Sequence, residues 1–166
     1  HLEGEHCISI NSLTKIYGLG PLRFGWIIAN KEIISNAKRA FLTFSGMMAS
    51  PTIRLASAVF PHLDLALEKI KAYREINLPV LREMLERQNI VWNEPPYGVF
   101  GAFQLPNGFD SMSFVDEACA EHSVLAVPGS MFSRELSGWL RVAWSIEPVL
   151  FSEAILNLEK ALISIH

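Results

Sequence analysis

The sequence predicts an α/β chain in two parts, in which a first part leads through one long helix into a small α+β domain at the C-terminal end. Short apolar runs bounded by glycine and proline alternate with segments whose apolar residues recur every three or four positions. The longest helical segment lies near the middle of the chain, at about residues 52–89. One group of predicted elements therefore precedes this segment and another follows it.

Composition narrows the class of protein. The 166 residues are 50% hydrophobic and 19% charged, so the chain is able to bury a substantial core, and we expect a globular, cytoplasmic protein. No apolar run approaches the roughly 18 to 20 residues that span a bilayer, and no charged-then-apolar leader opens the chain. The net charge of −3, with scattered basic residues, argues against nucleic-acid binding. Cys7 and Cys119 are too far apart in sequence to suggest a metal site or a disulfide framework.

The first part contains two predicted strands and a helix. Residues 5–10, with Ile8 and Ile10, alternate loosely and predict a short buried strand. Residues 23–30 form a nearly continuous apolar run, as expected for a strand that is covered on both faces. Residues 31–42 show helical spacing.

The long helical segment begins after a break that contains Gly46 and Pro51. Pro61 predicts a boundary within it and Pro79 a kink, because each proline removes a helix hydrogen bond. We expect its charged residues to form a solvated face with weak ion pairs between turns. These residues are Glu68, Lys69, Lys71, Arg74, Glu75, Arg82, Glu83, Glu86 and Arg87.

The second part predicts a β-β-α-β-β-α order, with turns rich in proline and glycine between the elements. The expected strands are residues 90–92, 99–105, 124–127 and 136–145, and the expected helices are residues 111–123 and 148–165. Ser111 or Ser113 is the expected cap of the first helix, and Pro148 suits the first turn of the second.

Three side chains near the start of the chain suggest chemistry. The hydroxyl of Ser12 lies three residues before Lys15, and Arg23 follows eight residues after that lysine. Two glycines and a proline between Lys15 and Arg23 predict a loop rather than a regular element. A lysine held between a strand and such a loop is fixed in place, which suits an amine that reacts.

Residues 10–26 resemble the lysine motif of the fold-type I, class I and II pyridoxal-phosphate-dependent aminotransferases. The resemblance implies that Lys15 attaches covalently to the cofactor and that Ser12 and Arg23 bind its phosphate. Two differences from the usual motif are the reversed glycine–proline order and the bulky Phe24 after the arginine.

Arg141 lies in the predicted strand 136–145, among apolar and aromatic residues. A guanidinium in such surroundings is costly to bury without an anionic partner. From the residues alone, an internal salt bridge or an arginine that reaches out to solvent explains the pattern. The resemblance implies instead that Arg141 grips the α-carboxylate of the substrate through a two-point fork. The segments 96–100 and 127–132 also resemble family landmarks at the mouth of the active site, although turn chemistry explains them equally well.

The resemblance implies an enzyme that transfers an amino group between an α-amino acid and a 2-oxo acid, with pyridoxal phosphate as cofactor, no metal, and a homodimeric assembly. Lys15 would then move a proton as general base and acid. The resemblance also implies that the chain is about the second half of the enzyme, and that a missing N-terminal half supplies the other cofactor contacts. It implies that residues 1–73 form the C-terminal part of the large cofactor-binding domain, with the start of the interdomain helix, and that residues 74–166 form the small α+β C-terminal domain.

Three alternatives remain open at this point. A decarboxylase or lyase of the same fold would carry the same lysine motif. A non-catalytic fragment used for interaction or regulation is consistent with the mean hydropathy of +0.25, which suggests exposed apolar surface. Ser12-x-x-Lys15 also resembles the acylation motif of penicillin-recognising enzymes, but the Lys-Thr-Gly or Lys-Ser-Gly triplet that this class needs downstream does not occur in the sequence.

Overall fold

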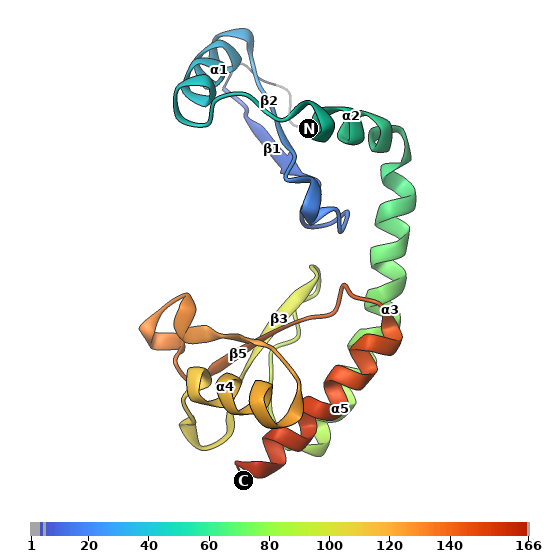
Figure 1. The fold of residues 1–166 in the computed structure, drawn as a ribbon, viewed down its shortest axis with the longest axis vertical. Coiled ribbons are helices and arrows are strands. Elements are labelled where there is room, and N and C mark those ends of the chain that lie inside the picture. The colour runs from blue at the N-terminus through green and yellow to red at the C-terminus, as the bar shows by residue number, and fades with distance from the viewer. Residues whose placement is uncertain (1–3, 5, 166) are drawn as a thin grey trace. The chain divides into compact units, whose positions relative to one another are not determined.

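The computed structural model describes residue 4 and residues 6–165, which form two compact units (Figure 1). The division falls between Glu68 and Lys69, inside the helix α3 (Leu63–Arg87). Each unit contains both strands and helices, so the chain is α/β as predicted. None of the helices in the described ranges combines the length and the apolar character that a membrane span needs.

The first unit is built on a β hairpin. Its elements are the strands β1 (Ser9–Ser12) and β2 (Gly25–Ile28), which pair antiparallel, and the helices α1 (Lys31–Phe44) and α2 (Ser50–Val59). Asn30 caps α1 because its side chain accepts a hydrogen bond from the backbone N–H of Ile33 at 2.9 Å. The helix predicted at residues 31–42 is therefore confirmed.

The predicted burial of both strands is wrong. The first strand lies at Ser9–Ser12 rather than at residues 5–10, of which residue 5 lies outside the described residues. Ile8 and Ile10 are 52% and 73% exposed, and Ile27 and Ile28 of the second strand are also exposed. Within the described part of this unit, the two-stranded ribbon has no layer over these side chains. Apolar alternation therefore located the hairpin without showing what covers it.

The long helical segment divides at Pro61, as predicted. α2 ends at Val59, a short 3₁₀ turn follows at Phe60–His62, and α3 begins at Leu63. Pro79 lies inside α3, which continues through it. Leu78 and Leu81 on either side are buried, so packing offsets the loss of the hydrogen bond that the proline cannot donate.

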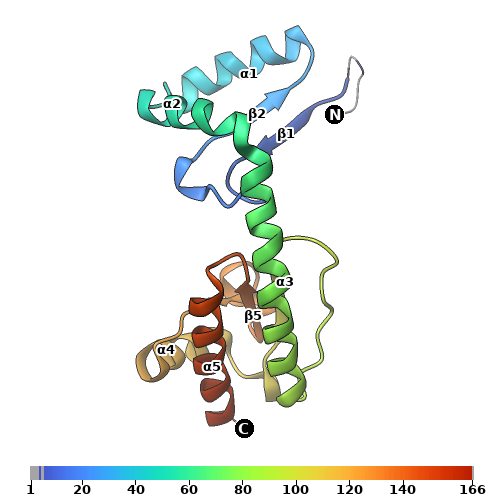
Figure 2. The same cartoon turned by 90° about the vertical axis from the view of Figure 1, so that its right-hand side faces the viewer.

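The second unit contains a three-stranded antiparallel sheet in the order β3-β5-β4. Its elements are β3 (Phe100–Gln104), α4 (Ser111–His122), β4 (Val127–Pro128), β5 (Trp139–Ala143) and α5 (Pro148–Ser164). The residues of α3 from Lys69 onward also belong to this unit. Figure 2 shows α4 and α5 lying side by side within it.

The core of the second unit lies between one face of the sheet and these helices. Phe103 of β3 and Leu140 of β5 face each other across the strand pair, and both are buried. They pack with apolar residues of three helices. α3 contributes Leu78, Leu81, Met84 and Leu85; α4 contributes Phe114, Val115 and Ala118; and α5 contributes Phe151, Ile155, Leu158, Ala161 and Leu162. The opposite face of the sheet carries Phe100, Ala102 and Arg141, because side chains alternate along a strand.

Three predictions for the second unit differ from the structure: the strand at residues 90–92, the cap of α4, and the strand at 124–127, which shares only residue 127 with β4. The other elements hold with shorter bounds. Residues 90–92 form no strand. The backbone N–H of Ile90 donates to the carbonyl oxygen of Leu85 at 2.9 Å, and the ring of Trp92 packs edge-to-face on that of Trp144. Asp110 caps α4 instead of Ser111 or Ser113, by accepting hydrogen bonds from the backbone N–H groups of Met112 and Ser113. β4 is only two residues long, and β5 five.

Candidate active site

The hairpin of the first unit holds Ser12 and Lys15. Ser12 is the last residue of β1 and pairs with Gly25 of β2. The backbone N–H of Leu13 donates to the carbonyl oxygen of Phe24 at 2.9 Å, which extends the pairing by one residue beyond the strand. Lys15 follows in a turn that closes when the N–H of Gly18 donates to the Lys15 carbonyl oxygen at 3.1 Å. The loop is therefore fixed at both ends by backbone hydrogen bonds.

Gly25 lets the two strands approach closely at Ser12. A Cβ atom at this position would lie 3.0 Å from the carbonyl oxygen of Asn11 and 3.4 Å from the Cβ of Ser12. The first distance is tighter than ordinary van der Waals contact, so a larger residue would push the strands apart. Gly25 of the motif thus allows β1 and β2 to lie close together at Ser12.

Arg23 has an unusual backbone conformation. It follows the 3₁₀ turn Gly20–Leu22 and has φ 46° and ψ 42°, in the left-handed region. A residue with a Cβ atom is there at a cost of about 1–2 kcal/mol, which glycine would avoid. Such strain at a predicted site residue points to a role for the side chain.

Aromatic side chains brace this hairpin. The ring of Phe60, which follows α2, lies 5.1 Å from that of Trp26 and 6.0 Å from that of Phe24, both in edge-to-face contact. Tyr17 lies 6.5 Å from Trp26 between ring centres, and Leu13 is fully buried. Phe24, the bulky residue after Arg23, is therefore part of the packing that supports the loop.

The structure brings Ser12, Lys15 and Arg23 together on one hairpin. Lys15 and Arg23 are exposed and Ser12 is half-buried. A hydroxyl and a guanidinium suit the oxygens of a phosphate, and an exposed lysine amine suits covalent attachment to a carbonyl group. These residues therefore fit a phosphorylated aldehyde cofactor. Arg141 belongs to the second unit.

Arg141 lies on the central strand of the three-stranded sheet. It pairs with Ala102 of β3 on one side and with Val127 of β4 on the other. The cavity beside it has a volume of about 520 Å³. It is lined by Asn93, Pro95, Phe100, Gly101, Ala102, Gly129, Phe132, Leu136, Trp139 and Arg141.

The guanidinium of Arg141 rests on aromatic rings rather than on a carboxylate. Its central carbon lies 4.9 Å from the ring centre of Phe100 and 5.1 Å from that of Phe132. Within the described residues, Arg141 has no ion pair, and its buried Nε has no hydrogen-bond partner. The internal salt bridge that the sequence left open is therefore absent from this part of the chain. A buried, unpaired N–H of a charged group favours an anionic ligand.

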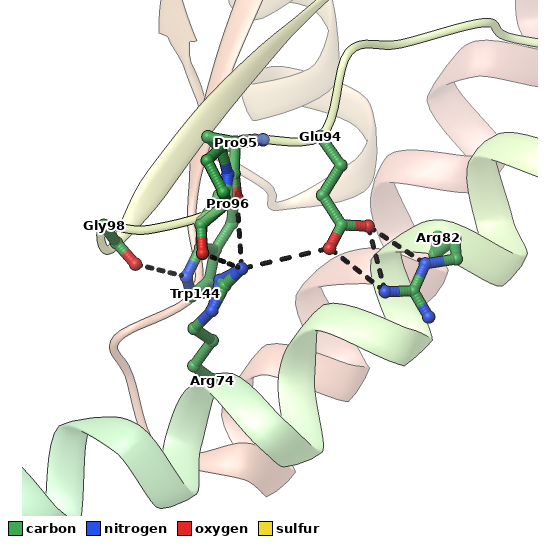
Figure 3. A network of polar contacts seen from close by, with 7 residues as sticks. All are labelled: Arg74, Arg82, Glu94, Pro95, Pro96, Gly98 and Trp144. Carbon is green, nitrogen blue, oxygen red and sulfur yellow. Dashed lines mark hydrogen bonds and ion pairs between the residues drawn. The ribbon is translucent and has the colours of Figure 1, made fainter.

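A polar network on α3, which the sequence did not predict, holds the segment 94–98 (Figure 3). Arg74 donates hydrogen bonds to the carbonyl oxygens of Pro95 and Pro96 at 3.0 and 3.3 Å. Arg82 forms a two-point pair with Glu94, at 3.0 and 3.1 Å. Both arginines bind residues distant in sequence, so the prediction of ion pairs between turns of the helix is wrong for them. The side chain of Arg82 is nevertheless 45% exposed, as expected of a solvated face.

Trp144 joins this network to the end of β5. Its indole N–H donates to the carbonyl oxygen of Gly98 at 3.1 Å, and its ring lies 5.7 Å from the guanidinium of Arg74 (Figure 3). The fully buried Asn77 donates to the carbonyl oxygens of Trp144 and Ile146, both at 2.9 Å. A polar residue at an apolar position of the helical repeat was the signal in the sequence for this contact.

Comparison with known proteins decides the family. The family model described as "Aminotransferase class I and II" matches residues 2–155. The chain belongs to this family. Among curated aminotransferases, the LL-diaminopimelate aminotransferase of Maridesulfovibrio salexigens is 25% identical over 154 residues, which are 92% of this chain and 39% of the relative. The aspartate aminotransferase of Pyrococcus horikoshii is 26% identical over 166 residues, which are 95% of this chain and 41% of the relative.

Solved aminotransferase structures share the fold. A pyridoxal-phosphate-dependent aminotransferase from Streptococcus suis superposes with a TM-score of 0.86 at 23% identity, over 96% of this chain and 42% of that one. An aminotransferase from Mycobacterium tuberculosis gives a TM-score of 0.80 at 20% identity, over 97% of this chain and 43% of that one. This chain thus spans about two fifths of the length of the relatives it matches.

Proposed function

We propose that this chain carries the reactive lysine of a pyridoxal-phosphate-dependent aminotransferase, which moves an amino group between an α-amino acid and a 2-oxo acid. One observation carries the proposal: Ser12, Lys15 and Arg23 lie on one braced hairpin in a chain of the aminotransferase family. The alternative of a penicillin-recognising enzyme loses its support, because the family match extends over residues 2–155.

The hairpin residues would divide the work. Ser12 and Arg23 bind the phosphate of the cofactor, the arginine through the fork of its N–H donors. Pyridoxal phosphate, when bound, withdraws electrons from the α-carbon of the substrate. The amine of Lys15 would anchor the cofactor, and as general base and acid it would take the proton from the substrate α-carbon and later return one. The backbone hydrogen bonds around Leu13 and Gly18 keep the main chain of Lys15 in place.

Arg141 would bind the α-carboxylate of the substrate. Its unpaired Nε–H lacks an acceptor within the described residues, and a carboxylate oxygen is the acceptor that its charge favours. Binding at this group orients the substrate and contributes no acid or base. In this proposal, residues 1–73 belong to the cofactor-binding domain and residues 74–166 to the small domain.

The complete enzyme, in this proposal, is a cytoplasmic homodimer. It also includes a polypeptide that corresponds to the remaining length of the relatives, of which this chain spans 39% in the Maridesulfovibrio salexigens aminotransferase. That polypeptide would complete the cofactor site.

The test is an absorbance spectrum of the complete enzyme, including this chain, with added pyridoxal phosphate, before and after borohydride reduction. We expect a visible band that borohydride converts into a permanent adduct on Lys15, found by mass spectrometry of the peptides. Lys15→Ala should lose the adduct, whereas Lys38→Ala, which changes an exposed lysine on α1, should keep it. An adduct elsewhere, or none, would overturn the assignment of Lys15 and leave the alternative of a fragment used for interaction.

A different reaction on the same fold is the second candidate. One relative, named capreomycidine synthase, from Streptomyces vinaceus, is 28% identical over 135 residues, which are 78% of this chain and 34% of the relative. A decarboxylase or lyase would release carbon dioxide or a side-chain fragment without needing a 2-oxo acid. Transamination instead requires the acceptor and forms one new 2-oxo acid for each acceptor consumed, which chromatography of the products measures.

A further inference from the structure

We propose that Phe100 and Phe132 are positioning residues, which hold the guanidinium of Arg141 so that its N–H donors stay free for a planar carboxylate. This inference rests on the proposed function, in which Arg141 binds the substrate carboxylate. It adds two residues to that site and explains how an arginine without a carboxylate partner is kept in one place.

The sheet register places Phe100 beside Arg141. Arg141 pairs directly with Ala102, and Phe100 is two residues earlier on the same face of β3. Diagonal neighbours of this kind lie within reach of long and aromatic side chains. The small side chain of Ala102 leaves the space directly opposite Arg141 open, so the ring of Phe100 reaches the guanidinium at 4.9 Å.

A tight turn places Phe132. The turn begins at Gly129, which is buried and packs against the backbone before β5. A Cβ atom on Gly129 would lie 2.3 Å from the carbonyl oxygen of Leu136 and 2.8 Å from that of Trp139, so only glycine fits here. This close approach brings the ring of Phe132 to 5.1 Å from the guanidinium of Arg141.

Two arginines of the same unit show why aromatic contacts matter. Arg82 is held by Glu94, which accepts from its Nε and Nη2 and so uses the donors of one edge. Arg141 is held by rings, which attract the cation through their faces and accept no N–H from that edge in the described structure. A carboxylate would position Arg141 equally well, but it would occupy the donors that a ligand needs.

This arrangement reduces the cost of binding. A free arginine side chain loses rotamer freedom when it binds a ligand, whereas one already confined by two rings loses less. The rings also displace water from beside the cation, which strengthens its attraction to an anion. We therefore expect the rings to contribute to affinity for the carboxylate and not to the proton transfer step.

The experiment compares amino acids with the amines that lack only the carboxylate. The trial pairs are L-leucine with 3-methylbutylamine, L-phenylalanine with 2-phenylethylamine, and L-aspartate with β-alanine. For each pair, the half-saturating concentration is measured from the change in the absorbance band of the protein loaded with pyridoxal phosphate. Phe132→Leu should weaken the amino acid about three- to tenfold, with little change in the maximal rate or in the half-saturation by the amine.

The variants are chosen to separate positioning from structure. Phe132 is 57% exposed, so its truncation leaves the core of the second unit intact. Phe132→Tyr keeps an aromatic ring and should restore the wild-type preference. Tyr73→Leu removes a cation contact of similar length, to Lys69 at 5.5 Å, and should leave the preference unchanged. Arg141→Gln, which removes the cation itself, should weaken the amino acid by more than tenfold.

A second measurement needs no substrate. In nitrogen-15 NMR spectra, the Nε–H signal of Arg141 is the one that disappears in Arg141→Lys. The ring currents should shift this signal upfield, and Phe132→Leu should reduce both the shift and the order of the side chain.

The outcomes separate the positioning role of the two rings from the carboxylate site at Arg141. If Arg141→Gln abolishes the preference for the amino acid while Phe132→Leu and Phe100→Leu leave it unchanged, the positioning role is wrong and the carboxylate site stands. If neither the wild type nor Arg141→Gln distinguishes amino acid from amine, the carboxylate site itself is wrong, and this inference with it. An Nε–H signal that is unaffected by Phe132→Leu would also contradict the positioning role.

Discussion

The two units of the chain differ in how they hold their functional side chains. In the described part of the first unit, Leu13 and Ala56 are the buried apolar residues. The second unit has a continuous core that involves α3, α4, α5 and one face of the sheet. Lys15 is therefore fixed by local contacts, namely turn hydrogen bonds and ring pairs, whereas Arg141 lies on a sheet that the whole unit supports. A functional residue can thus be positioned either by a loop that is braced locally or by a strand that a shared core supports.

The largest difference should appear in core truncations. Leu81→Ala removes a fully buried side chain of α3 and should lower the free energy of unfolding by about 3–5 kcal/mol, because the cavity cannot collapse completely. Ile10→Ala, on a strand of the first unit where this side chain is 73% exposed, should cost less than about 0.5 kcal/mol. Urea unfolding followed by circular dichroism measures both. Similar costs for the two variants would contradict the contrast in burial between the units.

An intermediate effect should follow from Asn77→Ala. This change leaves two backbone carbonyl oxygens, of Trp144 and Ile146, without their donor. The expected loss in the free energy of unfolding is about 2–3 kcal/mol. Asn36→Ala, at an exposed position of α1, is the matched control and should change it by less than about 0.5 kcal/mol. Equal effects at the two positions would show that the end of β5 does not depend on α3.

The smallest effect on stability should come from the ion pair between Arg87 of α3 and Glu159 of α5. The Nε of Arg87 lies 2.8 Å from the Oε1 of Glu159. The hydrogen bonds from Arg87 lower the pKa of Glu159 from its ordinary value of 4.5, against the opposing effect of desolvation. The pair therefore contributes stability above pH 4.5, and this contribution is lost as the pH falls through the lowered pKa of the folded state.

Glu159→Gln tests this pH dependence. The variant should be less stable than the wild type at pH 7, and the difference should shrink as the pH is lowered toward about 3. Denaturant midpoints at several pH values measure it. A difference that stays constant with pH would mean that packing of the side chain, and not its charge, accounts for the effect.

The sequence predicted most elements but not their burial or their long-range contacts. Helical spacing and proline positions located α1, the boundary at Pro61, α4 and α5. Residues 90–92 looked like a strand because they are apolar, but Val91 is exposed and Trp92 packs on the ring of Trp144, which is distant in sequence. Such pairings depend on which elements meet in space, which local patterns do not encode.

The candidate site shows the same limit. Spacing alone was enough to group Ser12, Lys15 and Arg23, because the residues lie on one hairpin and are close in the chain. The rings against Arg141 come from positions 41 residues before it and nine residues before it, so only the sheet register and the turn at Gly129 reveal them. The roles of all four predicted residues stay predictions until the spectra and substitutions are measured.

At Arg23, the backbone conformation favours glycine for stability, whereas the proposed phosphate contact needs the arginine side chain. The φ of 46° at this residue is a conformation that glycine adopts freely and arginine only at a cost. A search for more stable variants would therefore favour replacement of this residue, whereas a search for better anion binding would keep it. Laboratory evolution under the two selections would diverge first at this codon.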